Sequence, residues 1–128
     1  MAKFSEKSFQ KLDTCSPLLR EVAKEAIEVV DFSVLWGHRP KNEQNRLVEE
    51  GYSTLVWPRS KHNSWPSHAF DLAPWPIDWE DRERFFYLAG VIMGIARSYN
   101  TRVRWGGAWD GSLNREGQLD DLGHFELE

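Results

Sequence analysis

The sequence predicts an α+β fold: a single domain, residues 1–128, in which helices cover one face of a small, mostly antiparallel sheet. Two observations favour this class. Segments with apolar residues at three- and four-residue spacing are interspersed with short apolar segments of strand character. No repeat, low-complexity run or linker divides the 128 residues, and a chain of this length can bury a core without disulfides.

Three segments have the periodicity of amphipathic helices. The first covers residues 17–30, with Ser16 as its N-cap and a proline at the first helical position. The second is expected over residues 41–50, where Gly51 would end it. The third covers residues 81–99 and has the broadest apolar stripe, so we expect it to be mostly buried.

Four short segments are predicted to be strands: residues 32–36, 69–73, 102–105 and 123–127. Because side chains alternate along a strand, Asp71 shares a face with Ala69 and is turned away from His68 and Phe70. In the last strand, the same rule places His124 and Glu126 on one face, and Phe125 and Leu127 in the core. Residues 52–68 form a long connection with two proline turns, which is typical of functional loops.

Composition and charge exclude several classes of protein. No apolar run approaches the ~20 residues of a membrane span. A net charge of -4 argues against nucleic acid as a partner. Cys15 is the only cysteine, which excludes an internal disulfide and a thiolate-rich zinc site. The first residues are charged but are followed by no apolar segment, so we expect the protein to accumulate in the cytoplasm.

Seven tryptophans are an unusual feature of this composition, and several of them precede or follow prolines in residues 57–79. We expect these rings to close a small core around irregular loops. The alternative is that some of them line a groove for sugar or peptide.

His62, Asp71 and His124 can together hold one zinc ion and leave a position open for water. A lone histidine is more often a surface or core residue. Asp71, however, lies in an otherwise apolar strand, where an ionised carboxylate needs a compensating charge that a metal would provide. Asp121 precedes His124 by three residues and could serve as the catalytic base, with Asp120 as the competing candidate.

Further side chains could support such a site. Glu126 could accept the imidazole N–H of His124 and fix its tautomer. Arg39, with Gln44 five residues on, could bind a substrate carboxylate or a developing oxyanion, although an ordinary ion pair explains an arginine equally well. His38 has no carboxylate partner in the sequence and is interpreted as structural.

Several ordered motifs carry a resemblance to a known family. They are Asp31-Phe32 leading to Gly37-His38-Arg39 and Gln44, Ser60-Lys61-His62, Pro66-Ser67-His68-Ala69-Phe70-Asp71-Leu72-Ala73-Pro74, Ile77-Asp78-Trp79, the long helix, Arg104-Trp105-Gly106-Gly107 with Trp109-Asp110, and Asp121-Leu122-Gly123-His124-Phe125-Glu126. Over nearly its whole length the chain resembles the small zinc peptidases of the D-alanyl-D-alanine carboxypeptidase superfamily. Within that superfamily it resembles the phage endolysins that are L-alanyl-D-glutamate endopeptidases.

The resemblance implies roles for individual residues. Zinc would be held by His62, Asp71 and His124, with Asp121 as general base and acid. Arg39 would polarise or anchor the substrate, and Ser60 would match the serine two places before the first ligand. A Trp-Pro-Ser segment replaces the family glycine and lengthens the spacing from His62 to Asp71 by two. The carboxypeptidase branch commonly has Glu as its base, so an Asp favours the endopeptidase branch.

The sequence therefore predicts a monomeric zinc peptidase that cuts the L-alanyl-D-glutamate bond of the peptidoglycan stem peptide and lyses the host cell. By resemblance, it would accumulate in the host cytoplasm and reach the cell wall after a holin opens the membrane. The alternatives are a D-alanyl-D-alanine carboxypeptidase or dipeptidase, and a non-catalytic metal-binding relative.

Overall fold

A four-stranded sheet of order β1-β2-β4-β3 forms the centre of the computed structural model, which describes residues 2–111 and 120–128. The strands are β1 (Phe32–Trp36), β2 (Ala69–Pro74), β3 (Val103–Trp105) and β4 (His124–Leu127). All three strand pairings are antiparallel. The C-terminal strand β4 lies between β2 and β3, so residues more than 50 positions apart in the sequence become direct neighbours.

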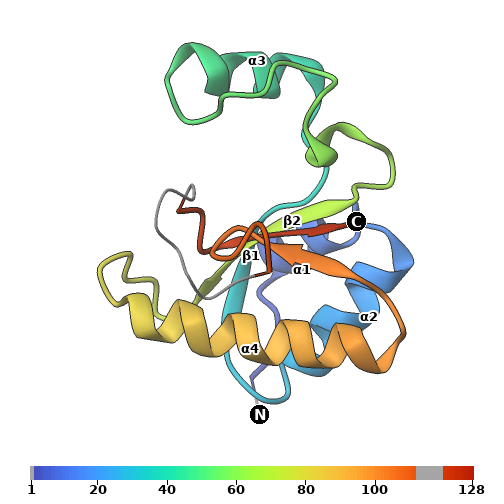
Figure 1. Ribbon diagram of the computed structural model, residues 1–128, viewed down its shortest axis with the longest axis vertical. Coiled ribbons are helices and arrows are strands. Elements are labelled where there is room, and N and C mark those ends of the chain that lie inside the picture. The colour runs from blue at the N-terminus through green and yellow to red at the C-terminus, as the bar shows by residue number, and fades with distance from the viewer. Residues whose placement is uncertain (1, 112–119) are drawn as a thin grey trace.

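Three helices, α1 (Glu6–Leu12), α2 (Pro17–Ala26) and α4 (Arg82–Ser98), pack on one face of the sheet (Figure 1). The fourth, α3 (Lys41–Glu49), lies on the opposite side (Figure 1). We call residues 41–59, which contain α3 and the loop after it, the α3 lobe. The α+β class is confirmed, and the expected covering of one face is correct for all the described α-helices except α3.

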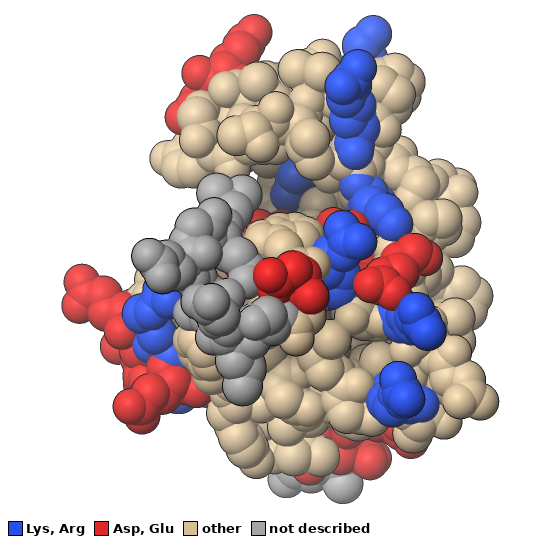
Figure 2. All heavy atoms as spheres, viewed as in Figure 1, with Lys and Arg blue, Asp and Glu red and all other residues tan. Residues whose placement is uncertain are grey.

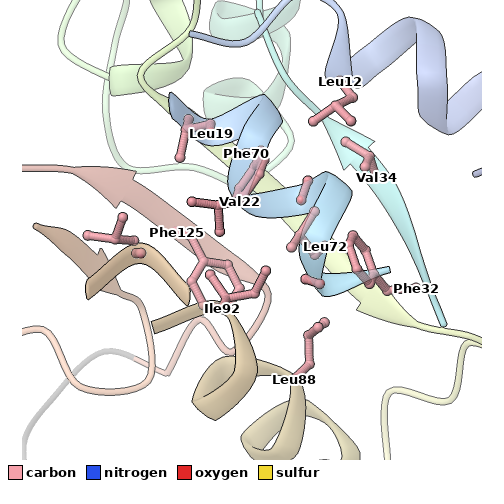
Figure 3. Close-up of a cluster of buried hydrophobic side chains, with 14 of the residues drawn as sticks. Leu12, Leu19, Val22, Phe32, Val34, Phe70, Leu72, Leu88, Ile92 and Phe125 are labelled. Atoms are coloured by element: carbon pink, nitrogen blue, oxygen red, sulfur yellow. The ribbon is translucent and has the colours of Figure 1, made fainter. Parts of the chain in front are cut away.

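The core fills the space between the sheet and the three packed helices (Figure 3). Phe70 of β2 and Phe125 of β4 are fully buried and meet edge to face, with ring centroids 6.0 Å apart. Leu19 of α2 and Ile92 of α4 are also fully buried in this cluster. Because side chains alternate along each strand, burying Phe70 and Phe125 turns Asp71 and its β4 neighbours to the opposite face.

The strand register agrees with the predicted division of faces. Phe70 pairs with Phe125 on the core side, and Asp71 pairs with His124 on the other side. Ala69 pairs with Glu126, which therefore shares the face of Asp71.

The helix predictions were wrong in several respects. Helix α1 was not predicted, although Ser5 caps it by accepting a hydrogen bond from the Ser8 N–H. Helix α2 ends at Ala26 rather than at residue 30, because the chain turns there toward β1, leaving Val29 exposed. Ser16 is at its N-cap position but makes no side-chain cap bond. Gly51 ends α3 as expected, with a φ of 82°.

Two burial predictions were also wrong. Helix α4 is not mostly buried: one face packs on the core, while Tyr87 is 56% exposed. The tryptophans beside prolines do not close the core either, since Trp57, Trp65 and Trp75 are 38%, 70% and 58% exposed. The core is filled instead by aliphatic side chains and by five other aromatic residues, namely Phe32, Phe70, Phe85, Trp105 and Phe125. No helix among the described residues is long and apolar enough to cross a bilayer.

Candidate metal and active site

The site begins at a bulge near the end of β1. The register shifts between Val34 and Trp36, so that Trp36 lies opposite Asp71 on the face away from the core. The ring of Trp36 then supports Arg39, whose guanidinium carbon lies 4.7 Å from the ring centroid. Simple alternation along β1 would place Trp36 on the core face, so no role was predicted for it.

His62 is carried by a short 3₁₀ helix, η1 (Lys61–Asn63), which Ser60 caps. The Ser60 hydroxyl accepts a hydrogen bond from the His62 N–H, and the Asn63 side chain accepts one from the Ser60 N–H. The His62 Nδ1–H donates to the carbonyl of Gly37 over 2.8 Å. Since Nδ1 is occupied, the ring presents Nε2 to the site. Ser60 thus acts on His62 through the backbone.

His62, Asp71 and His124 come together from three separate segments. His62 Nε2 lies 3.3 Å from Asp71 Oδ2, and His124 Nδ1 lies 3.0 Å from Asp71 Oδ1. The two ring nitrogens are 3.3 Å apart. One ligand atom from each of the three residues lies within 4.8 Å of the other two, a spacing that suits a single metal ion.

Glu126 accepts a hydrogen bond from His124 on the side away from Asp71. The distance from His124 Nε2 to Glu126 Oε1 is 2.8 Å. This bond places the proton of a neutral imidazole on Nε2 and leaves the Nδ1 lone pair facing Asp71 and His62. Both histidines are nearly inaccessible to solvent, with 2% of His62 and 8% of His124 exposed.

The electrostatics of this cluster favour positive charge between the ligand atoms. Burial by itself would raise the pKa of Asp71, but the charges and hydrogen bonds of His62 and His124 hold that pKa well below its ordinary value. Burial disfavours the charged form of His124, yet hydrogen bonds from its ring to Asp71 and Glu126 raise its pKa to about 10. A proton and a metal cation compete for the same Nδ1 position.

Arg39 is held rigidly beside the cluster. It donates to Asp71 Oδ2 over 3.3 Å and to Gln44 Oε1 over 3.0 Å. Gln44 is fully buried, and its amide donates to the Ser53 hydroxyl and the Leu55 carbonyl, which ties α3 to the following loop. Arg39 therefore forms the ion pair that composition suggested, but the pair is part of the site.

Asp121 lies in the turn before β4 and lines the same cleft as the three candidate ligands. Its backbone packs against Gly106, with hydrogen bonds from Asp121 N to Gly106 O and from Gly106 N to His124 O. A Cβ atom at position 106 would collide with the Asp121 carbonyl. Burial and the charge of Asp71 raise the pKa of Asp121, which makes its carboxylate a stronger base. Asp120, the competing candidate, pairs with Arg82 of α4 over 2.6 Å.

A cleft of about 950 Å³ lies between the α3 lobe and the exposed face of the sheet, and the candidate ligands are on its wall. Figure 2 shows the hollow between the lobe and the body, with basic side chains around it. Trp109 also lines the cleft, its ring 5.4 Å from that of His124. No role was predicted for Trp109, or for Arg59 and Arg104, which share the lining, because nothing local in the sequence shows which segments face a cleft.

The remaining histidines lie apart from the cluster. His38 Nδ1 is 2.9 Å from the Ser64 carbonyl, which fits the structural role expected for it. His68 is exposed just before β2, and neither residue lines the cleft.

Comparisons with known proteins identify the family and agree with the fold. Residues 1–128 match the family described as phage L-alanyl-D-glutamate peptidase. The L-alanyl-D-glutamate peptidase of Escherichia phage T5 is 30% identical over 135 residues, covering 98% of this chain and 97% of the relative. The crystal structure of the Serratia marcescens L-Ala D-Glu endopeptidase ChiX superposes with a TM-score of 0.79 at 28% identity, covering 98% of this chain and 90% of that one. By this full-length match, the chain belongs to the phage L-alanyl-D-glutamate peptidase family.

Proposed function

We propose that this protein is a zinc-dependent hydrolase that cleaves the L-alanyl-D-glutamate bond in the stem peptide of peptidoglycan. The observation that carries the proposal is the convergence of His62, Asp71 and His124 on the wall of the cleft, with Arg39 and Asp121 on the same lining. The names of the phage T5 relative and of the Serratia marcescens structure refer to the same bond.

The donor set fits zinc. His62 would bind through Nε2, His124 through Nδ1 and Asp71 through its carboxylate. The opposite N–H of each ring has an acceptor, the Gly37 carbonyl for His62 and Glu126 for His124. Three nitrogen and oxygen donors leave a coordination position open. When bound, the metal supplies Lewis acidity toward a water molecule and the scissile carbonyl.

Asp121 is proposed to move the proton. Its carboxylate would accept a proton from the attacking water and return it to the amine of the leaving D-glutamate, which breaks the C–N bond. The raised pKa of Asp121 supports this role. Asp120 is paired with Arg82 and is therefore the weaker candidate.

Arg39 is proposed to stabilise negative charge on the carbonyl oxygen as the water attacks. A donor that is already fixed needs no reorganisation in the transition state. Trp36 beneath the guanidinium and Gln44 beside it provide that fixation.

Digestion of purified peptidoglycan tests the proposed reaction. We expect zinc-loaded protein to produce fragments with new D-glutamate amino termini by mass spectrometry. A chelator should abolish the products, and added Zn²⁺ should restore them. Release of D-alanine alone would indicate the carboxypeptidase alternative. Zinc-bound protein that forms no product would indicate a non-catalytic relative.

We also infer that the protein acts as a monomer, accumulates in the host cytoplasm and reaches the wall after a holin opens the membrane. Sedimentation should then give a mass near 15.0 kDa. Expression in a bacterial host should cause rapid lysis only when a holin is expressed with it, whereas lysis without one would contradict the inferred route.

A further inference from the structure

The proposed substrate carries a negative charge close to the bond that is cut. Glutamate has two carboxyl groups, and only one of them can continue the peptide chain. A free carboxyl group therefore lies within one residue of the scissile nitrogen. Burying this charge in the cleft requires a cation to compensate it. The inference below rests on the proposed function, because it concerns the substrate of that reaction.

Four basic side chains line the cleft: Arg39, Arg59, Lys61 and Arg104. Two of them are already engaged. Arg39 is paired with Asp71 and Gln44, and the Lys61 ammonium donates to the Leu127 carbonyl over 2.5 Å. Within residues 2–111 and 120–128, the side chains of Arg59 and Arg104 form no hydrogen bond or ion pair. The charge of Arg104 lowers the pKa of Glu126, its neighbour across the strand pair. Because Glu126 is hydrogen-bonded to His124 instead, the guanidinium N–H groups of Arg104 remain available to an incoming anion.

The position of Arg104 is set by the sheet. Arg104 lies on β3 and pairs directly with Glu126 of β4. Both side chains therefore point to the face that carries Asp71 and His124. Paired residues of antiparallel strands have Cα atoms about 5 Å apart, and next-but-one residues along a strand are about 7 Å apart. The Arg104 Cα is therefore about 8–9 Å from that of His124. An arginine side chain can span much of this distance toward the residue next to the scissile bond.

Arg59, by contrast, lies in the loop of the α3 lobe, where no strand pairing fixes its backbone. A guanidinium also presents paired N–H groups that match a carboxylate, and a regular strand orients them better than a loop. We propose that Arg104 binds the free carboxylate of the substrate glutamate and makes the enzyme selective for glutamate over its carboxamide.

Two synthetic peptides test this proposal, identical except that the free carboxyl of the glutamate is a carboxylate in one and a carboxamide in the other. We expect the zinc-loaded wild type to cleave the carboxylate peptide with the higher kcat/KM. Arg104→Gln should lower kcat/KM for that peptide about 10- to 100-fold, the usual contribution of a hydrogen-bonded charge. It should leave the carboxamide peptide nearly unchanged, so the selectivity disappears, and Arg104→Lys should restore part of it.

The matched control is Arg102→Gln. Arg102 is an exposed residue two positions before Arg104, and it does not line the cleft. Its substitution by Gln removes the same charge, so this variant should keep the wild-type selectivity. Arg59→Gln should also keep it. Selectivity that survives in Arg104→Gln, or that disappears in Arg59→Gln instead, would overturn the assignment. Equal loss on both peptides would indicate a purely structural role and would overturn it as well.

The outcome for the proposed function is separate. If the wild type cleaves neither peptide, the L-alanyl-D-glutamate activity itself is wrong, and the inference about Arg104 falls with it. If the wild type cleaves both peptides equally, the activity stands and only the role of Arg104 is rejected.

Discussion

Asp71 and His124 lie directly opposite each other on β2 and β4, and Asp71 Oδ1 is 3.0 Å from His124 Nδ1. The pair next to it, Phe70 and Phe125, is buried on the other face of the same two strands. One strand pairing thus places an ionisable pair in the cleft and an aromatic pair in the core. Packing of the aromatic pair keeps the register that the ionisable pair needs, because a slip by one residue would exchange the two faces.

Loss of a candidate ligand should remove metal-dependent stability. His124→Ala is expected to bind less than one zinc per chain, and zinc should no longer raise its melting temperature. For the wild type, zinc at 100 times its Kd should add about 2.7 kcal/mol to the free energy of unfolding. Metal analysis and thermal melts with and without a chelator measure both effects. His68→Ala is the control and should behave like the wild type; an unchanged zinc response in His124→Ala would reject the ligand assignment.

Asp121 should be required for turnover but not for metal binding. Asp121→Ala is expected to retain zinc and to lose about 10²- to 10⁴-fold in kcat, the usual contribution of a general base. Asp120→Ala removes the neighbouring carboxylate and its pair with Arg82, and should lose far less activity. Steady-state cleavage with metal analysis of each variant separates the two residues. A larger loss in Asp120→Ala would transfer the base role to Asp120.

Gly106 should be intolerant of any side chain. Gly106→Ala would place a methyl group against the Asp121 backbone and force the turn before β4 to move. We expect a loss of about 1–3 kcal/mol in the free energy of unfolding and a fall in kcat. Gly90→Ala in α4 is the control, since its Cβ would meet no atom within 4 Å. Helix propensity should make that variant up to about 1 kcal/mol more stable. Wild-type activity in Gly106→Ala would show that the turn can adjust.

Ionisation of Cys15 should lower the stability of the protein at alkaline pH. Burial raises the pKa of this thiol from 9.0 to about 12. The pKa of the thiol is higher in the folded than in the unfolded protein. The contribution of Cys15 to the free energy of unfolding is therefore complete below pH 9 and is lost as the pH rises from 9 toward 12. The loss should be about 1.4 kcal/mol per pH unit in that window. Denaturant unfolding at pH 7.5 and pH 10 should show a larger decrease for the wild type than for Cys15→Ala. Equal decreases would mean that Cys15 is ionised in the folded protein.

Much of the site's composition follows from local rules. Strand alternation predicts that Asp71 turns away from Phe70 and that His124 and Glu126 share a face, because the period of two is set by the covalent geometry of an extended chain. An isolated charged residue in an apolar strand, such as Asp71, indicates a bound partner, because a buried charge is costly unless an opposite charge or a metal compensates it.

Other features could not be predicted locally. The bulge that brings Trp36 opposite Asp71 depends on the pairing of β1 with β2. The position of His62 depends on the Gly37 carbonyl and on the capped turn at Ser60, within a long irregular connection. The tryptophans beside prolines are exposed because other side chains had already filled the core, a competition that no single segment reveals.

For β2 and β4, the sequence alone indicated which side chains face the core and which face the cleft, because alternation along a regular strand depends only on neighbouring residues. The tertiary structure decided which of those faces meet. Insertion of β4 between β2 and β3 places His124 against Asp71 and Glu126 against Arg104. Such contacts join residues separated by 53 and 22 positions, and their geometry arises only when the whole core packs.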